Sequence, residues 1–151
     1  AIRSGDLPDS NLVALPLANT QLKLFASPDF DQSLIHKPQD LESHAWVALK
    51  SAALSELILN NQQNEKVCIR PHYQDSANNI HSYQKLIEAG FGIGLMAQHS
   101  GQVLVDQGRF MPVLADWYLD ALPVSLVFPS RIHMAKRTRL FIQVLRQTFD
   151  R

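Results

Sequence analysis

The chain alternates short apolar runs with polar clusters, a pattern typical of strands and helices in an α/β protein. Ala45–Leu49 is apolar at every position, as expected of a strand buried on both faces of a parallel sheet. From Asn78 to Ala89, a single helical face collects the apolar side chains, and Gly90 is placed to end the helix. The residues predicted on that face are Ile80, Tyr83, Leu86 and Ile87. Phe91–Met96 then predicts another strand.

The same criteria predict elements along the rest of the chain. Strands are predicted at Asn11–Leu17 (ended by Pro16 and Asn19), Leu22–Ala26, Arg109–Leu114, Trp117–Leu119 and Val124–Phe128. Gly5–Ser10 is rich in turn residues. Helices are predicted to start at Ser27-Pro28 and to cover Lys37–Leu41, Ser100–Gln107 (ended by Gly108) and 135–149. The apolar side of the last helix is predicted to contain Phe141, Val144, Leu145 and Phe149.

One stretch fits two structures. Leu57–Leu59 and Val67–Ile69 flank the polar segment Asn60–Glu65, which predicts a β-hairpin with a polar tip. Ala52–Leu59 also contains good helix formers, so a helix is the alternative. We favour the hairpin.

The turn from Asp75 to Asn79 is the main candidate for a binding site. Asp75, Ser76, Asn78 and Asn79 come where a strand ends and a helix begins. The free N–H groups of a helix N-terminus bind anions, and ligands of open α/β sheets lie beyond the carboxyl ends of the strands. The same residue types are also the preferred helix caps, which require no ligand. Both interpretations stay open at this point.

Composition limits the function classes. With 46% hydrophobic and 19% charged residues the chain is an ordinary globular one, and its formal net charge of zero argues against DNA binding through bulk charge. No apolar run is long enough for a membrane helix. The single cysteine, Cys68, is consistent with a reducing compartment, so we expect a cytoplasmic protein. The opening Ala1-Ile2 resembles an interrupted strand, and we expect the chain to be a piece of a longer protein.

The motifs of catalysis and cofactor binding are missing from the sequence. Gly90, Gly92 and Gly94 follow a helix and open a strand, which is the reverse of a dinucleotide-binding loop. The six histidines lack the spacing of a metal site, and neither a nucleophile elbow nor a poised carboxylate pair is present. The basic cluster in 131–139 opens an amphipathic helix, which favours a solvated face or a protein contact. We therefore predict no catalytic residue, no metal and no cofactor.

A series of short segments, in order and at characteristic spacing, resembles a known family. They are Ala1–Gly5, Leu7–Ser10, Val13–Leu17, Leu24–Pro28, Pro38–Leu41, Ala89–Gly94, Gly108–Val113, Leu122–Arg131 and Phe141-Ile142. Together they are similar to the effector-binding domain of LysR-type transcriptional regulators, over essentially the whole chain. Members of that family have an N-terminal helix-turn-helix and a two-lobed effector domain with a type 2 periplasmic-binding-protein-like α/β fold.

The resemblance implies that the chain has one complete Rossmann-like lobe and part of the other. It implies a complete second lobe over about 20–117, with hinge and first-lobe remnants at 1–19 and 118–151. The first half of the first lobe and the helix-turn-helix have no counterpart here. That lobe contributes to the effector pocket in the family, so only part of the pocket is assigned. We also expect an exposed apolar edge that leads the chain to self-associate as a dimer or tetramer.

Family behaviour places a small-molecule effector in the cleft between the lobes. The matching positions in this sequence are Arg3, Ser4, Ala48, Leu49, Asp75, Ser76, Ala77, Asn78, Ile93 and Phe128. A helix N-terminus beside an arginine favours a carboxylate. The expected function is therefore effector sensing in a bacterial transcription regulator without enzymatic activity, with DNA bound only through the helix-turn-helix. The alternative is a solute-binding protein of a transport system.

Overall fold

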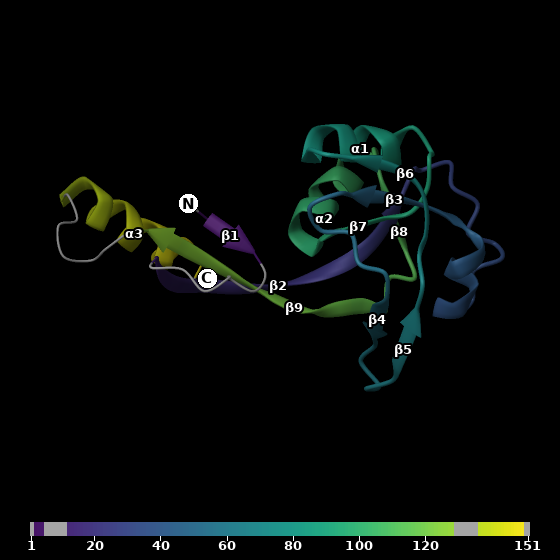
Figure 1. The fold of residues 1–151 in the computed structure, drawn as a ribbon, viewed down its shortest axis with the longest axis horizontal. Helices are drawn as coiled ribbons and strands as arrows, with labels where there is room; N and C mark the ends of the chain where they lie inside the picture. Colours follow the sequence, from purple (N-terminus) through teal and green to yellow (C-terminus); the bar gives the residue numbers. More distant parts are fainter. Residues whose placement is uncertain (1, 5–11, 129–135, 150–151) are drawn as a thin grey trace. The chain divides into compact units, whose positions relative to one another are not determined.

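The computed structural model describes residues 2–4, 12–128 and 136–149, and it divides into two compact units (Figure 1). The larger unit is Gln21–Asp120, and the smaller one combines Ala1–Thr20 with Ala121–Arg151. Two long strands, β2 (Val13–Ala26) and β9 (Tyr118–Phe128), contribute residues to both units. The mixed α/β architecture agrees with the fold class expected from the sequence.

In the larger unit, a parallel strand pair carries the turn singled out by the sequence. β3 (Ala45–Leu49) pairs in parallel with β6 (His72–Ala77), and Trp46 forms a further parallel bridge to Ile93. The helix α1 (Ile80–Glu88) follows β6 directly and packs on both strands. A strand, a turn and a helix therefore follow one another as predicted.

A second sheet has the strand order β5-β4-β9-β2-β7, in which β4 pairs antiparallel with β5 and β9, and β2 pairs antiparallel with β7. The strands β7 (Gly94–Ala97) and β8 (Met111–Val113) both pair with β2, and α2 (Gln98–Asp106) connects them. A short 3-10 helix, η1 (Pro38–Ser43), matches the helix predicted at Lys37–Leu41. Both α1 and α2 are followed by a glycine with positive φ, Gly90 at 86° and Gly108 at 69°, as predicted for the helix ends.

The ambiguous stretch is a hairpin formed by β4 (Leu57–Asn60) and β5 (Lys66–Ile69). The Asn61 side chain organises its tip, because Oδ1 accepts hydrogen bonds from the backbone N–H groups of Gln63 and Glu65, both at 3.0 Å. Leu57, Leu59 and Ile69 are buried, as strand alternation requires. The hairpin prediction is confirmed, and the alternative helix over Ala52–Leu59 is wrong.

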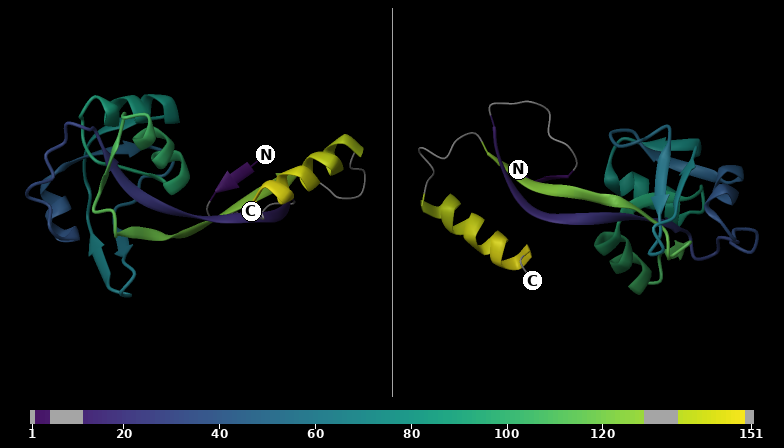
Figure 2. Two further views of the ribbon diagram at one scale, coloured as in Figure 1. Left: turned by 180° about the vertical axis from the view of Figure 1, so that it is seen from behind. Right: turned by 90° about the horizontal axis from the view of Figure 1, so that it is seen from below.

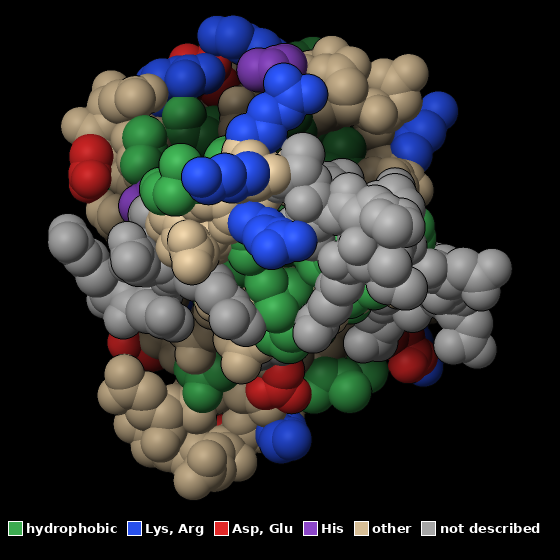
Figure 3. All heavy atoms as spheres, turned by 90° about the vertical axis from the view of Figure 1, so that its left-hand side faces the viewer, with side chains coloured by type: hydrophobic (Ala, Val, Ile, Leu, Met, Phe, Trp, Pro, Cys, Tyr) green, Lys and Arg blue, Asp and Glu red, His purple; other side chains and the backbone are tan. Residues whose placement is uncertain are grey.

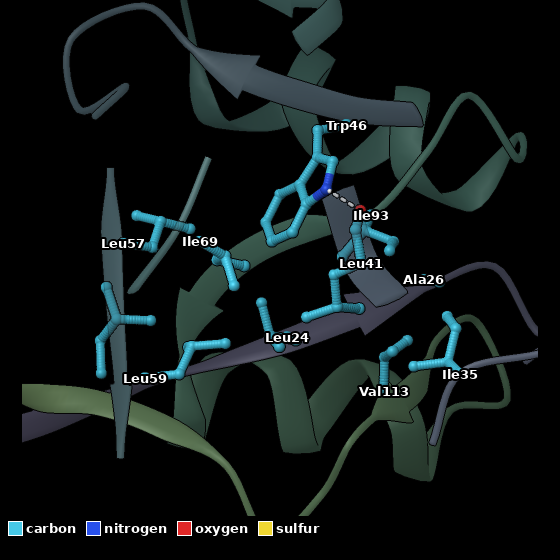
Figure 4. Close-up of a cluster of buried hydrophobic side chains, with 11 residues drawn as sticks. Leu24, Ala26, Ile35, Leu41, Trp46, Leu57, Leu59, Ile69, Ile93 and Val113 are labelled. Atoms are coloured by element: carbon cyan, nitrogen blue, oxygen red, sulfur yellow. Dashed lines mark hydrogen bonds between the residues drawn. The ribbon is translucent and has the colours of Figure 1, made fainter. Parts of the chain in front are cut away.

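The core of the larger unit lies on both faces of β3. On one face Trp46 packs with Leu24, Leu41 and neighbouring side chains, and its indole Nε1 donates a hydrogen bond to the Leu41 carbonyl at 3.0 Å (Figure 4). On the other face Val47 joins the cluster around Tyr83 and Ile87 of α1. The prediction that Ala45–Leu49 is buried on both faces is confirmed.

The smaller unit contains β1 (Ile2–Ser4), paired antiparallel with β9, and α3 (Lys136–Phe149) (Figure 2). Its apolar cluster consists of Leu15, Leu17 and Leu126, with Phe128, Ile142 and Leu145 packed against it. The predicted apolar side of α3 needs correction, because Phe141 and Val144 are 56% and 54% exposed. Leu145 packs inward as predicted, together with Ile142, and the side chain of Phe149 lies outside the described part of the structure. Figure 3 shows hydrophobic side chains at the surface beside Lys and Arg side chains on the face that it draws.

Several predicted boundaries are wrong for identifiable reasons. Ser27-Pro28 opens a turn and not a helix, because the Ser27 carbonyl accepts from the Phe30 N–H at 3.0 Å and the chain then continues without helix. The strand predicted at Asn11–Leu17 was expected to end at Pro16 and Asn19, but β2 continues through both into the strand predicted at Leu22–Ala26. The strands predicted at Trp117–Leu119 and Val124–Phe128 are likewise one strand, β9. Tertiary pairing overrides these local breakers.

Smaller differences concern α1 and its neighbours. Ile80 is 44% exposed and does not join Tyr83 and Ile87 on the buried face. The strand predicted at Phe91–Met96 starts only at Gly94, because Gly92 has φ 154° and its Cα lies against the Ala45 backbone. A Cβ at Gly92 would lie 2.5 Å from the Ala45 oxygen, so glycine is required there. The turn cluster at Gly5–Ser10 and part of the basic cluster lie outside the described residues.

Candidate functional site

A hollow of about 660 Å³ opens beside the N-terminal half of α1. It is lined by Lys50, Ser76, Ala77, Asn78, His81, Ser82, Lys85 and Leu86. All of these residues belong to the larger unit. The hollow lies at the carboxyl ends of β3 and β6, where Leu49 is opposite Ala77 and the Lys50 N–H donates to the Ala77 carbonyl at 2.9 Å. This is the edge at which open α/β folds bind ligands.

Asn79 caps α1 and also positions two lining residues. Its backbone is extended, with φ −141° and ψ 158°, and its Oδ1 accepts a hydrogen bond from the Ser82 N–H at 2.9 Å. Its Nδ2 donates to Asn78 Oδ1 and to Ser82 Oγ, each at 3.1 Å. The turn was interpreted either as a binding site for an anion or as a helix cap, and the role of Asn79 is that of a cap. Asn78 and Ser82 remain on the hollow, with their orientation fixed by the cap.

The described residues that line the hollow include basic side chains and no acidic ones. Lys50, His81 and Lys85 supply the potential positive charge, and Ser76, Asn78 and Ser82 supply hydroxyl and amide groups. Within the described part of the chain, the side chains of Lys50, Ser76 and His81 have no hydrogen-bond or ion-pair partner. These groups are free to bind a solute, and their charge favours an anion.

Lys85 is the one lining cation that has a protein partner. Its Nζ lies 2.9 Å from Oε2 of Glu88, the last residue of α1. The same carboxylate accepts hydrogen bonds from Nε and Nη2 of Arg109, both at 2.9 Å. These hydrogen bonds, first from Arg109 and then from Lys85, lower the pKa of Glu88 to about 2. Glu88 is therefore ionised at neutral pH and neutralised from two sides.

The structure brings together three of the residues assigned from the sequence, Ser76, Ala77 and Asn78, on the hollow. Leu49 is half-buried at the end of β3, and Ala48 before it is buried. Asp75 is half-buried and is not among the residues that line the hollow.

The other assigned residues are not among those that line the hollow. Ile93 is 0% exposed and belongs to the core cluster around Trp46, so its side chain does not reach the hollow. Phe128 belongs to the smaller unit, where it packs against Leu126 and its neighbours. Arg3 and Ser4 form part of β1 in the same unit, and their side chains lie outside the described part of the structure.

Sequence reasoning missed five lining residues: Lys50, His81, Ser82, Lys85 and Leu86. A signal for most of them was available in the helical period. Residues 81 and 85 are four positions apart, as are 82 and 86, so these four share one face of α1 beside the capped turn. Lys50 was harder to find, because only the parallel register between β3 and β6 places it next to Asn78.

Among residues 2–4, 12–128 and 136–149, no group of three His, Cys, Asp or Glu side chains is arranged to hold a metal ion. Within the same ranges, each helix is too short or too polar to cross a membrane.

Sequence relatives of this chain include HTH-type transcriptional regulators. It is 26% identical over 152 residues to an HTH-type transcriptional repressor of Pseudomonas aeruginosa, covering 98% of this chain and 48% of the relative. It is also 26% identical over 153 residues to the HTH-type transcriptional regulator PtxR of P. aeruginosa, covering 100% and 49%. The chain thus spans about half the length of these curated relatives.

Solved structures share the fold. The regulatory domain of CrgA, a LysR-type transcriptional regulator from Neisseria meningitidis, superposes with a TM-score of 0.74 at 23% identity, covering 98% of this chain and 74% of that one. Full-length AphB, the Vibrio cholerae virulence activator, gives 0.73 at 24% identity, covering 98% and 51%. The family model described as the LysR substrate binding domain matches residues 1–150. This chain therefore belongs to the LysR substrate-binding domain family.

Proposed function

We propose that this chain is the ligand-sensing regulatory domain of a bacterial DNA-binding transcription regulator. The observation that carries the proposal is the family match over residues 1–150. The regulators of P. aeruginosa that match nearly all of this chain support it further. In this proposal DNA is bound only by an N-terminal helix-turn-helix outside this chain, the protein is cytoplasmic, and subunits self-associate.

We further propose that residues 20–117 form the complete second lobe, and that 1–19 and 118–151 form the hinge and part of the first lobe. The division of the structure into Gln21–Asp120 and the remainder supports this assignment. An effector in the interlobe cleft would bind one lobe arrangement better than another. Such a difference in affinity shifts the population of conformations and, through it, the arrangement of subunits on DNA.

The effector in this proposal is a small molecule, most simply a carboxylate. Ser76, Ala77 and Asn78 line a hollow at the carboxyl ends of two parallel strands, and its charged side chains are basic. A carboxylate there gains from Lys50 and from the N-terminal end of α1. Arg3, Ser4 and Phe128 are assigned to the first-lobe side of the same site by family resemblance alone.

The transport alternative predicts different segments on the N-terminal side of this chain. A solute-binding protein needs a secretion signal and no helix-turn-helix. The relatives compared above are transcription regulators, which favours the regulatory function over transport and over catalysis.

The decisive experiment is to read the gene on the 5′ side of the codon for Ala1. We expect an open frame that encodes a helix-turn-helix followed by the opening elements of the first lobe. A signal peptide followed only by the missing lobe would overturn the regulatory function in favour of extracytoplasmic solute binding.

A second experiment tests the site in the intact regulator. Replacing Arg3 and Ser76 together with alanine should abolish the effector-dependent reporter response and leave DNA binding intact. Ser100→Ala, at an exposed position of α2 outside the hollow, is the matched control. An unchanged dose response in the double variant would remove these two residues from the site.

A further inference from the structure

The three basic side chains of the hollow are distributed along it. Lys50 comes directly after β3 and lies beside the strand ends, with the hydroxyl of Ser76 on the same hollow. Lys85 lies in the second turn of α1, and a helix rises 1.5 Å per residue, so its Cα is roughly 7 Å further along the axis than that of Ile80. His81 lies in the first turn of α1 and also lines the hollow. The two lysines of the hollow therefore come from different elements, Lys50 from the end of β3 and Lys85 from the second turn of α1.

We propose that the ligand of this hollow carries two anionic groups, one held by Lys50 with Ser76 and the other by Lys85. The inference rests on the proposed function, since it names the chemical class of the effector. It is more specific than a carboxylate, because a ligand with one charge satisfies Lys50 alone. A short dicarboxylate and a phosphorylated carboxylic acid share the required chemistry.

Lys85 can bind such a ligand with little loss of free energy from its existing ion pair. Its pair with Glu88 is an exposed one, with 72% of the lysine side chain accessible, and exposed pairs between neighbouring helical positions are weak. Glu88 also keeps both hydrogen bonds from Arg109 when Lys85 moves away, so its charge stays neutralised. An anion in the hollow can therefore take Lys85 from Glu88 without leaving a carboxylate unpaired.

Lys50 has a different role because it starts without a partner. Its backbone is fixed by the hydrogen bond from its N–H to the Ala77 carbonyl, which continues the parallel register of the two strands. Its ammonium group has no ion pair within the described residues, and no acidic residue lines the hollow. Lys50 can therefore bind an anion without breaking an ion pair, and Lys85 adds selectivity for a ligand with a second charge.

The test is a titration of the 151-residue chain, followed by amide chemical shifts in nuclear magnetic resonance. The probes are succinate, phosphoglycolate and butyrate; butyrate matches succinate in carbon number but has one charge. We expect succinate or phosphoglycolate to shift the amides of Lys50, Ser76 and Lys85 at lower concentration than butyrate does. Whichever of these two ligands binds more tightly identifies the second anionic group as carboxylate or phosphate.

Three lysine variants make the test specific. Lys85→Met should weaken the dianion about tenfold and leave butyrate unchanged, whereas Lys50→Met should weaken both. Lys66→Met removes an exposed lysine of β5 outside the hollow and should change neither. Equal affinity for succinate and butyrate, equal losses in Lys66→Met and Lys85→Met, or no shifts at millimolar concentration would overturn the inference. The upstream gene sequence tests the regulatory function independently of all these outcomes.

Discussion

Glu88 and Arg109 form a two-pronged ion pair that ties the end of α1 to the segment after α2. Nε and Nη2 of the guanidinium donate to Oε1 and Oε2 of the carboxylate, both at 2.9 Å. The side chains are only 27% and 32% exposed, unlike those of the other arginine pair, Arg70 with Glu56, at 77% and 50%. Bidentate geometry and partial burial both strengthen an ion pair.

Removing this guanidinium should therefore destabilise the fold. We expect Arg109→Met to lower the urea midpoint of unfolding, because Glu88 then keeps only its exposed contact with Lys85. Arg70→Met, at the exposed pair, is the matched control and should leave the midpoint nearly unchanged. Equal midpoints for the two variants would show that the Glu88–Arg109 pair contributes nothing beyond a surface contact.

The same pair predicts a dependence of stability on pH. Its hydrogen bonds lower the pKa of Glu88 from 4.5 to about 2 in the folded chain. The folded state thus binds the proton more weakly than the unfolded state, so this stabilisation is fully present above pH 4.5 and is lost as the pH falls towards 2. The difference in urea midpoint between the wild-type chain and Arg109→Met should shrink across that window. A difference that stays constant from pH 6 down to pH 3 would contradict the assignment to Glu88.

Tyr83 offers a sharper stability test inside the core. Its hydroxyl donates to the Leu95 carbonyl at 3.0 Å and accepts from the Leu95 N–H at 2.7 Å, linking α1 to β7. Burial raises the pKa of Tyr83 above that of an ordinary tyrosine, so the hydroxyl stays protonated. Tyr83→Phe leaves this backbone without its hydroxyl partner and should cost about 2 kcal/mol. Tyr73→Phe loses only an exposed hydrogen bond to the Leu54 carbonyl and should cost far less, as denaturant titrations of both variants would reveal.

The local sequence pattern predicted the correct element wherever burial and periodicity agree. The five apolar residues of β3, the polar tip of the β4–β5 hairpin and the glycine after α1 each predicted the element that is present. Pro16 and Asn19 misled the prediction because β2 is held by neighbours far away in sequence, and such pairing is invisible locally. Ser27-Pro28 has the residues of a helix start, but no helical apolar face follows it.

The candidate site was only partly predictable for a related reason. Ser76, Ala77 and Asn78 are contiguous in sequence, so one turn motif points to all of them. Lys50 is distant in sequence and reaches the hollow through the parallel pairing of β3 with β6. Ile93 was assigned by resemblance, yet it fills the core beside Trp46. Residues that pairing brings together cannot be read from the spacing of one segment.

The cap of α1 links stability to ligand binding, and two variants separate these roles. Asn79→Ala removes the acceptor for the Ser82 N–H and should cost about 1 kcal/mol in thermal or denaturant unfolding. Asn79→Ser keeps a capping oxygen but loses the Nδ2 donor that holds Asn78 and Ser82. We expect Asn79→Ser to retain most of the stability and still bind succinate more weakly. Succinate affinity unchanged in Asn79→Ser would show that the amide does not position the hollow.

We expect the 151-residue chain to self-associate, and among the described residues α3 carries three exposed large apolar side chains, Leu140, Phe141 and Val144. Leu140 and Phe141 are neighbours on that helix and are 62% and 56% exposed. Burial of such side chains favours association. We expect the sedimentation coefficient to rise with concentration, and Leu140→Lys together with Phe141→Lys to suppress the rise. Val103→Lys, at an exposed apolar position of α2, is the control and should not suppress it. A single monomer boundary at high concentration in the wild-type chain would contradict the prediction, and equal suppression by all variants would attribute it to added charge alone.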